Sequence, residues 1–221
     1  MKNRQVLWVG LFAVAFAFVE SSVVVYLRSI YYPDGFAFPL KLMTSFHLWV
    51  ELAREASTIV MLGCVAMVAG TSKWQRLAYF LIAFGVWDIF YYVWLKVLLN
   101  WPTSILDWDI LFLIPLPWIG PVLAPVLVSI ILIAAGFMVL RFALRSESLQ
   151  VDNKSLALSV AGTFIVLFSF LRQPDAAALP ENAIQYSYNL FLLGLICYLG
   201  ALFIQRKKWT EHQQPGNPIG R

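Results

Sequence analysis

Long apolar runs, separated by short polar or proline-containing turns, set the pattern of this chain. Each run is about 17 residues or longer, which is the length that a helix needs to cross the hydrocarbon core of a bilayer. The pattern predicts six membrane-spanning helices, over residues 6–28, 43–70, 77–99, 122–144, 155–172 and 184–204. We therefore expect an all-α, polytopic transmembrane helical bundle in which residues 1–205 form one domain.

The composition agrees with this interpretation. Of the 221 residues, 61% are hydrophobic and 13% are charged, whereas a typical soluble domain is about 45–50% apolar and about 25% charged. The surplus apolar surface must face lipid, so the lipid bilayer is the expected partner. The chain carries no basic stripe of the kind that binds nucleic acid, and we expect no nucleic-acid partner.

Residues 105–144 form a nearly continuous apolar stretch, about twice as long as one span needs. Prolines break its first half, because proline lacks a backbone donor and clashes with the preceding helical turn. We assign the helix to residues 122–144. Residues 105–120 are interpreted as a proline-rich interfacial or re-entrant segment, with a kinked helix start as the alternative. Re-entrant backbone persists at membrane depth only where protein buries it or a wet cavity adjoins it. We therefore expect this segment to cover a cavity, with Asp107 and Asp109 at its rim.

The basic residues predict the topology. With six spans, one side receives ten of them: Lys2, Arg4, Lys73, Arg76, Arg141, Arg145, Lys154, Arg206, Lys207 and Lys208. The other side receives four: Arg28, Lys41, Lys96 and Arg172. Lysine and arginine concentrate on cytoplasmic loops. We expect a multi-pass protein of a cell inner (plasma) membrane with both termini cytoplasmic, and a basic, disordered tail over residues 206–221.

The span 43–70 carries a polar stripe. At about 100° per residue, five side chains fall within roughly a quarter-turn of one helix face: His47, Glu51, Arg54, Glu55 and Thr58. A charged residue at the bilayer centre costs roughly 2.5–3.5 kcal/mol on insertion scales. The stripe therefore requires either a partner surface within the membrane or a function.

The topology converts sequence position into depth. At 1.5 Å per residue, Glu20, Glu51 and Asp88 lie about 12–13 Å below the outer surface on three consecutive spans. The deep acids outnumber Arg54, so an ion-pair network that only joins helices does not account for all of them. The arrangement predicts an outward-facing acidic intramembrane pocket formed by nine residues: Glu20, His47, Glu51, Arg54, Glu55, Asp88, Tyr91, Tyr92 and Asp109.

The first function predicted for this pocket is binding or translocation of a cation, a proton or a small polar ligand. Acid-lined layers mark ion and proton pathways in membranes, and aromatic faces accept organic cations. A divalent metal is an alternative occupant. His47 and Glu51 stand four residues apart on one helix, and Glu20 and Asp88 complete a nitrogen and oxygen donor set that suits Zn, Fe or Mn.

Two further functions stay open. One is an integral membrane enzyme, metal-dependent in one version, that acts on a lipid or lipid-linked substrate at the outer leaflet. The chain lacks GxSxG, HExxH and glycine-rich phosphate motifs, so no catalytic residues are assigned. The spacing of His47 and Glu51 resembles that in sterol-isomerase-type membrane domains, but their other motifs do not follow and no residue role is transferred. The other function is a non-catalytic scaffold subunit whose polar stripe contacts a partner helix. The oligomeric state stays open.

Overall fold

Six helices and two short strands make up the described part of the computed structural model, which comprises residues 2–41, 43–114, 116–145, 149–172, 178–180 and 185–212. The helices are α1 (Lys2–Tyr31), α2 (Ser45–Ala69), α3 (Lys73–Leu99), α4 (Leu123–Ala143), α5 (Asn153–Leu171) and α6 (Tyr188–His212). All six are long and apolar enough to cross a membrane. The predicted all-α bundle is therefore confirmed, and the chain is a multi-pass integral membrane protein.

Side-chain caps explain where three of the helices begin. Thr44 accepts a hydrogen bond from the His47 backbone N–H at 3.3 Å, at the start of α2. Ser72 does the same for Gln75 at the start of α3, also at 3.3 Å. Asp152 accepts from the Lys154 N–H at 2.9 Å, before α5. Each cap satisfies a backbone donor that has no partner within its helix.

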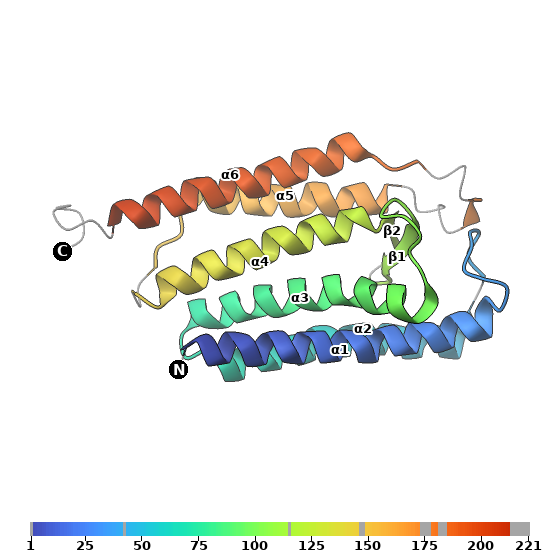
Figure 1. Ribbon diagram of the computed structural model, residues 1–221. Helices are drawn as coiled ribbons and strands as arrows, with labels where there is room; N and C mark the ends of the chain where they lie inside the picture. The colour runs from blue at the N-terminus through green and yellow to red at the C-terminus, as the bar shows by residue number, and fades with distance from the viewer. Residues whose placement is uncertain are drawn as a thin grey trace.

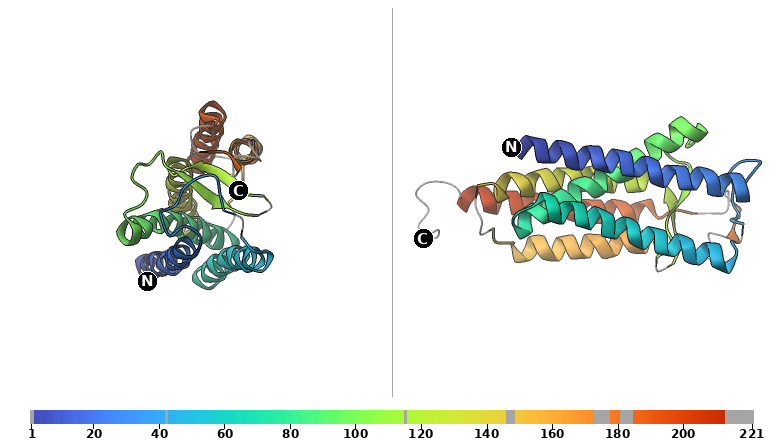
Figure 2. Two further views of the ribbon diagram at one scale, coloured as in Figure 1. Left: turned by 90° about the vertical axis from the view of Figure 1, so that its right-hand side faces the viewer. Right: turned by 90° about the horizontal axis from the view of Figure 1, so that it is seen from below.

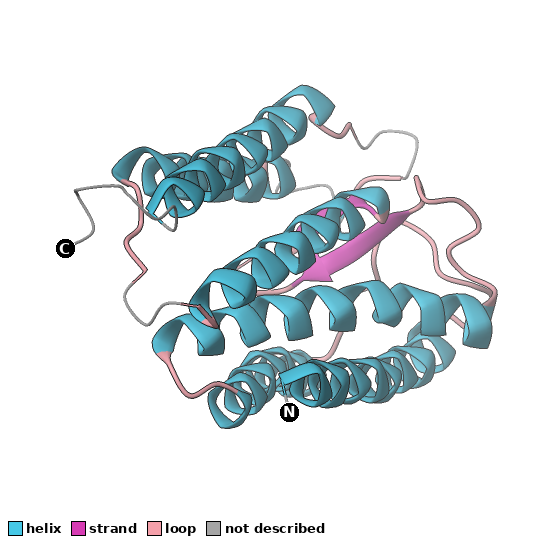
Figure 3. Cartoon of the chain, turned by 60° about the vertical axis from the view of Figure 1, so that its left-hand side comes forward, coloured by secondary structure: helices cyan, strands magenta, loops and turns pink. Residues whose placement is uncertain are grey.

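The helices run side by side, so that Lys2 and His212 lie at one end of the bundle (Figure 1). We call this the terminal end. Helix α3 is central and packs against α1, α2 and α4, whereas α5 packs mainly against α6 (Figures 1 and 3). Helix α4 stands between these two groups and contacts α6.

Glycine allows the closest helix approaches. A Cβ added at Gly85 of α3 would lie 2.6 Å from the Ser129 carbonyl oxygen of α4. A Cβ added at Gly136 of α4 would lie 2.9 Å from the Ala78 carbonyl oxygen of α3. Such contacts matter in lipid, where van der Waals packing rather than the hydrophobic effect holds helices together.

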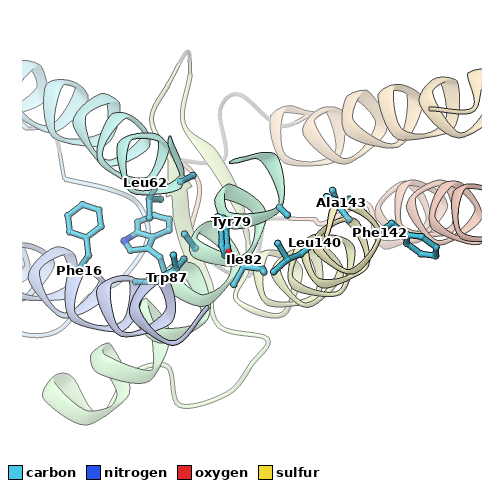
Figure 4. Packing of buried hydrophobic residues seen from close by; sticks show 14 of the residues in the cluster. Phe16, Leu62, Tyr79, Ile82, Trp87, Leu140, Phe142 and Ala143 are labelled. Atoms are coloured by element: carbon cyan, nitrogen blue, oxygen red, sulfur yellow. The ribbon is translucent and has the colours of Figure 1, made fainter. Parts of the chain in front are cut away.

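The largest apolar cluster fills the space between α1, α2, α3 and α4 towards the terminal end (Figure 4). Leu62 of α2 and Tyr79 of α3 are fully buried in it, with exposed fractions of 0%. A second cluster joins α5 and α6 to the segment before α4, where the rings of Trp118 and Phe170 stack with centroids 6.2 Å apart.

The proline-rich segment before α4 forms an antiparallel β-hairpin. Its strands are β1 (Trp108–Phe112) and β2 (Trp118–Pro121), and Asp109 pairs with Gly120. The hairpin crosses the end of the bundle opposite the terminal end, between the α1–α3 group and the α5–α6 pair (Figure 2). We call this the hairpin end. The alternative of a kinked helix start is wrong, because the residues before α4 form the paired strands β1 and β2 instead of a helix.

Two predicted boundaries need correction. Helix α6 continues past residue 204 to His212, so residues 206–212 are helical and are not a disordered tail. The reason is an anchor that hydropathy does not detect: Gln205 Nε2 and Trp209 Nε1 donate to the Gln150 carbonyl at 3.0 Å and 2.8 Å. Helix α1 likewise continues past Arg28 to Tyr31. The predicted tail residues 213–221, the predicted sixth-span start at residue 184 and Pro115 lie outside the described residues.

Candidate functional site

A cavity of about 370 Å³ lies at the hairpin end, between the C-terminal part of α1, the N-terminal part of α2 and the hairpin. We call it the hairpin-end cavity. Five of the nine predicted pocket residues line it: Glu51, Arg54, Glu55, Tyr91 and Asp109. Its other walls combine apolar side chains, aromatic rings and two basic residues: Val24, Leu27, Arg28, Tyr31, Tyr32, Phe36, Leu40, Lys41, Met43, Leu48, Ile110, Leu113, Pro117 and Ala178.

Helical periodicity explains why α1 and α2 meet at this site. The residues of each helix that lie at the cavity or contact its floor and edge recur every three or four positions, so they share one helix face. On α1 these are Glu20, Val24, Leu27, Arg28 and Tyr31, and on α2 they are His47, Glu51, Arg54, Glu55 and Thr58. The polar stripe of α2 therefore contacts α1 and the hairpin within this chain.

Arg54 forms the floor of the cavity together with acids from both helices. Its Nη1 contacts Glu20 Oε2 on α1, and its Nη2 lies 2.8 Å from Glu51 Oε2 on α2. The hydroxyl of Thr58 donates to Glu20 Oε1 at 2.9 Å. Glu20 and Glu51 are buried, with exposed fractions of 3% and 5%. One guanidinium therefore serves two buried carboxylates.

Glu55 connects α2 to the hairpin. Its two carboxylate oxygens accept from the Leu113 backbone N–H at 2.9 Å and 3.1 Å. This N–H follows β1 directly and is the hydrogen-bond donor that the structure gives to the buried Glu55 side chain. Glu55 thus holds the hairpin over the cavity but keeps a carboxylate at the cavity wall.

Arg28 and Asp109 form a second buried pair, 3.5 Å apart between Nη2 and Oδ1. The Arg28 guanidinium also lies over two rings, 4.3 Å from the Phe36 centroid and 3.8 Å from the Trp101 centroid. Two buried atoms of the pair, Arg28 Nε and Asp109 Oδ2, have no hydrogen-bond partner among the described residues. Burial raises the pKa of Asp109 to about 6, although the Arg28 guanidinium opposes this shift.

His47 lies beside the cavity rather than in its lining. Its Nδ1 forms a hydrogen bond with the hydroxyl of Tyr31, and Tyr31 lines the cavity. Nearby, the Lys41 backbone N–H donates to the Tyr32 hydroxyl at 2.7 Å. The first contact joins α1 to α2, and the second connects the two ends of the loop between these helices.

Asp88, Tyr92 and Glu20 also lie outside the lining of the cavity. Asp88 accepts a hydrogen bond from the Ser129 hydroxyl of α4 at 2.8 Å and so belongs to the α3–α4 interface. Tyr92 is buried with its hydroxyl beside the Asp109 carboxylate. Glu20 lies beneath the cavity, on the far side of the Arg54 guanidinium.

The four predicted metal ligands do not converge. Glu20 is paired with Arg54, His47 with Tyr31, and Asp88 with Ser129. Among the described residues, no group of three or more histidine, cysteine, aspartate or glutamate side chains is arranged to hold a metal ion.

Two cationic residues of the cavity were placed at the membrane surface by the sequence interpretation. Arg28 turns inwards because two aromatic rings and Asp109 receive its guanidinium, whereas Lys41 is exposed. Arg28 lies on the same face of α1 as Glu20. This shared face was the signal in the sequence that could have placed Arg28 at the site. The charged groups at the cavity and its floor comprise four buried carboxylates, Glu20, Glu51, Glu55 and Asp109, the buried Arg28 guanidinium and the half-buried Arg54 guanidinium.

In comparisons with known proteins, no protein-family model, no curated protein and no solved structure matches this chain.

Proposed function

We propose that the protein binds a small amphipathic cation in the hairpin-end cavity. The observation that carries this proposal is the charge of the groups at the cavity and its floor. Four buried carboxylates face the guanidiniums of buried Arg28 and half-buried Arg54, whereas Lys41, the third basic residue of the lining, is exposed. Carboxylates in excess inside a membrane protein must be protonated, bind a cation or contact water. A bound cation is the occupant that also fits the rest of the cavity.

The walls support an occupant with an apolar part. Leu27, Leu40 and Leu113 line the cavity together with the rings of Tyr31 and Tyr91. Aromatic faces attract cations, and apolar walls accept an alkyl chain. The volume of about 370 Å³ lies within the range of small-molecule sites.

Binding is better supported than translocation. The space between the cavity and the terminal end is occupied by the close-packed cluster around Leu62, Tyr79 and Ile82, whose exposed fractions are 0%, 0% and 1%. A translocation pathway would have to separate α2 from α3 there. We therefore propose a binding protein that holds its ligand near one membrane surface.

The excess of basic residues at the terminal end supports a topology with both termini in the cytoplasm, as the positive-inside rule requires. The hairpin-end cavity would then face the outer side of a cell inner (plasma) membrane. Accessibility of a cysteine introduced at exposed Asp34, near the hairpin end, would test this topology with a membrane-impermeant maleimide. Labelling in intact cells is expected, and labelling only after lysis would contradict it.

Calorimetric titration of the protein in lipid nanodiscs would test the function. The probes are hexylamine, trimethylhexylammonium, hexanoate and hexanol, each corrected for binding to empty nanodiscs. We expect both cations to bind more tightly than hexanoate and hexanol. Glu55→Gln keeps an oxygen that accepts from the Leu113 N–H but removes a charge, so the affinity for both cations should fall.

Asp34→Asn is the matched control, because Asp34 is an exposed acid near the same end of the bundle. It should leave both affinities unchanged. Binding of hexanoate as tight as that of hexylamine, or no binding of either cation, would contradict the proposal.

The second candidate is an integral membrane enzyme that acts on a lipid-like substrate at the outer leaflet. The contact between His47 and Tyr31 favours it, because an imidazole and a phenol in hydrogen-bond contact supply an acid–base pair beside the cavity. Incubation with a total lipid extract, followed by mass spectrometry, would test it. A lipid converted by the wild type but not by His47→Gln would favour the enzyme, whereas an unchanged extract would favour binding alone.

A further inference from the structure

We infer that the ligand is a primary amine with an apolar tail, and that Asp109 is the residue that receives its ammonium group. This inference rests on the proposed function and makes it more specific. It concerns the end of the cavity formed by β1 and the C-terminal part of α1.

The Asp109 carboxylate is only half satisfied. Its side chain is 5% exposed, and its Oδ1 faces Arg28 Nη2 at 3.5 Å. Its Oδ2 is fully buried, and no described residue donates to it with the geometry of a normal hydrogen bond. The Tyr92 hydroxyl and the Ile110 backbone N–H lie close enough to the carboxylate to lower its pKa, but neither has the geometry of a hydrogen bond to Oδ2. A buried acceptor without a donor costs about 1–3 kcal/mol. Because Asp109 lines the cavity, a ligand that reaches Oδ2 from the cavity would supply the missing donor.

The Arg28 guanidinium already has other contacts besides Asp109 Oδ1. It lies over Phe36 and Trp101, with centroids 4.3 Å and 3.8 Å away. A carboxylate accepts on both oxygens. A second cation at Oδ2 therefore leaves the contact between Arg28 and Oδ1 intact.

The free acceptor at Asp109 Oδ2 should favour a primary over a quaternary ammonium ion. A primary ammonium carries three N–H donors and forms charge-assisted hydrogen bonds with a carboxylate. A quaternary ammonium has no donor and interacts only through its charge and the aromatic rings. Because Asp109 lines the same cavity as Leu27, Leu40 and Leu113, an alkyl chain attached to the ammonium can lie along apolar walls.

The test compares hexylamine with trimethylhexylammonium by calorimetry on the full chain in lipid nanodiscs. The wild type should bind hexylamine at least about tenfold more tightly, which corresponds to the gain of one charge-assisted hydrogen bond. Asp109→Asn should reduce this preference to less than about twofold. Asp107→Asn is the matched control, because Asp107 lies two residues away and accepts from the Thr103 N–H and hydroxyl at 2.7 Å and 2.8 Å instead of lining the cavity.

Each outcome of the test decides a different point. Equal binding of the two cations by the wild type overturns the inference but leaves the proposed function standing. A preference for hexylamine that survives in Asp109→Asn overturns the role of Asp109. Failure of both cations to bind the wild type overturns the proposed function itself. The comparison within the wild type needs no variant, so it stays decisive even if Asp109→Asn fails to fold.

Discussion

The two ends of the bundle are built by different interactions. Towards the terminal end, α3 and α4 approach closely at Gly136, and Leu62 and Tyr79 are fully buried. At the hairpin end, carboxylates, guanidiniums and tyrosines surround a cavity of about 370 Å³. Close apolar packing dominates the first region, with hydrogen bonds such as those of Gln205 and Trp209 at its edge, whereas the second contains buried charged groups and a cavity.

This contrast separates structural from functional demands. Small residues and close contacts suffice to join helices in lipid, so stability alone does not require ionisable groups at the other end. A buried ion pair is weak evidence for stability, because apolar residues of similar volume often replace it without loss. Under the proposed function, the charged groups of the hairpin end serve a ligand rather than folding alone.

Removal of Arg54 should have the largest effect of any change at the hairpin end. Arg54→Met leaves Glu20 and Glu51 buried without their guanidinium partner. Breaking a buried pair on one side costs about 3–5 kcal/mol. We expect a loss of this size in the free energy of unfolding, measured by denaturant titration in detergent micelles.

A triple variant distinguishes the loss of a partner from the loss of packing. In Arg54→Met combined with Glu20→Gln and Glu51→Gln, the two carboxylates that Arg54 contacts are neutral as well, and most of the lost stability should return. If the triple variant is as unstable as Arg54→Met alone, the charges at this end do not have the role described above.

Substitution of a packed glycine should destabilise the other region by a smaller amount. A Cβ at Gly136 would lie 2.9 Å from the Ala78 backbone oxygen, so Gly136→Ala must move α4 away from α3. Overpacking of this kind typically costs about 1–3 kcal/mol. Gly63→Ala is the control, because nothing lies within 4 Å of its added Cβ. Its stability should stay unchanged or rise slightly, since alanine is the better helix former. Equal losses in the two variants would contradict the close packing of α3 on α4.

The pH dependence of binding should report on Asp109. Its pKa of about 6 means that the carboxylate is charged above pH 6 and becomes neutral below it. Alkylamines stay protonated throughout this range, so the affinity for hexylamine should fall about tenfold per pH unit below about pH 6. The charged and titratable groups that face Asp109 are Arg28 on α1 and Asp88, Tyr91 and Tyr92 on α3. A pH profile that is unaltered in Asp109→Asn would exclude Asp109 as its source.

Substitution of Asp88 should have the smallest effect on binding. Asp88→Asn retains an oxygen that can accept from the Ser129 hydroxyl, and Asp88 does not line the cavity. We expect the affinity for hexylamine to change by less than about twofold, because the substitution removes a charge that does not touch the cavity. A loss as large as that of Asp109→Asn, measured by the same titration, would return Asp88 to the binding site.

The sequence predicted the six spans because a helix that crosses the bilayer must be apolar over a length set by the thickness of the hydrocarbon core. It also predicted that Glu51, Arg54 and Glu55 share one face, which follows from helical periodicity alone. Hydropathy did not predict that Arg28 turns inwards, because this depends on Phe36 and Trp101. Those two residues lie in loops whose positions no periodicity specifies.

The hairpin and Asp88 illustrate a second limit of sequence interpretation. Prolines excluded a straight helix before α4, but strand pairing such as that of Asp109 with Gly120 depends on contacts between the two strands. Depth was inferred for Glu20, Glu51 and Asp88 from helix rise. Depth does not specify the direction in which a side chain points around the helix, and Asp88 points to Ser129 on α4.

The most direct test of the central claim is an experimental structure of the protein soaked with 6-bromohexylamine. The bromine gives an anomalous signal that locates the alkyl end independently of the density for the protein. The account predicts the ammonium at Asp109 Oδ2 and the bromine among Leu27, Leu40 and Leu113 inside the hairpin-end cavity. Bromine found only on the lipid-facing surface, or a cavity left unchanged at saturating amine, would contradict it.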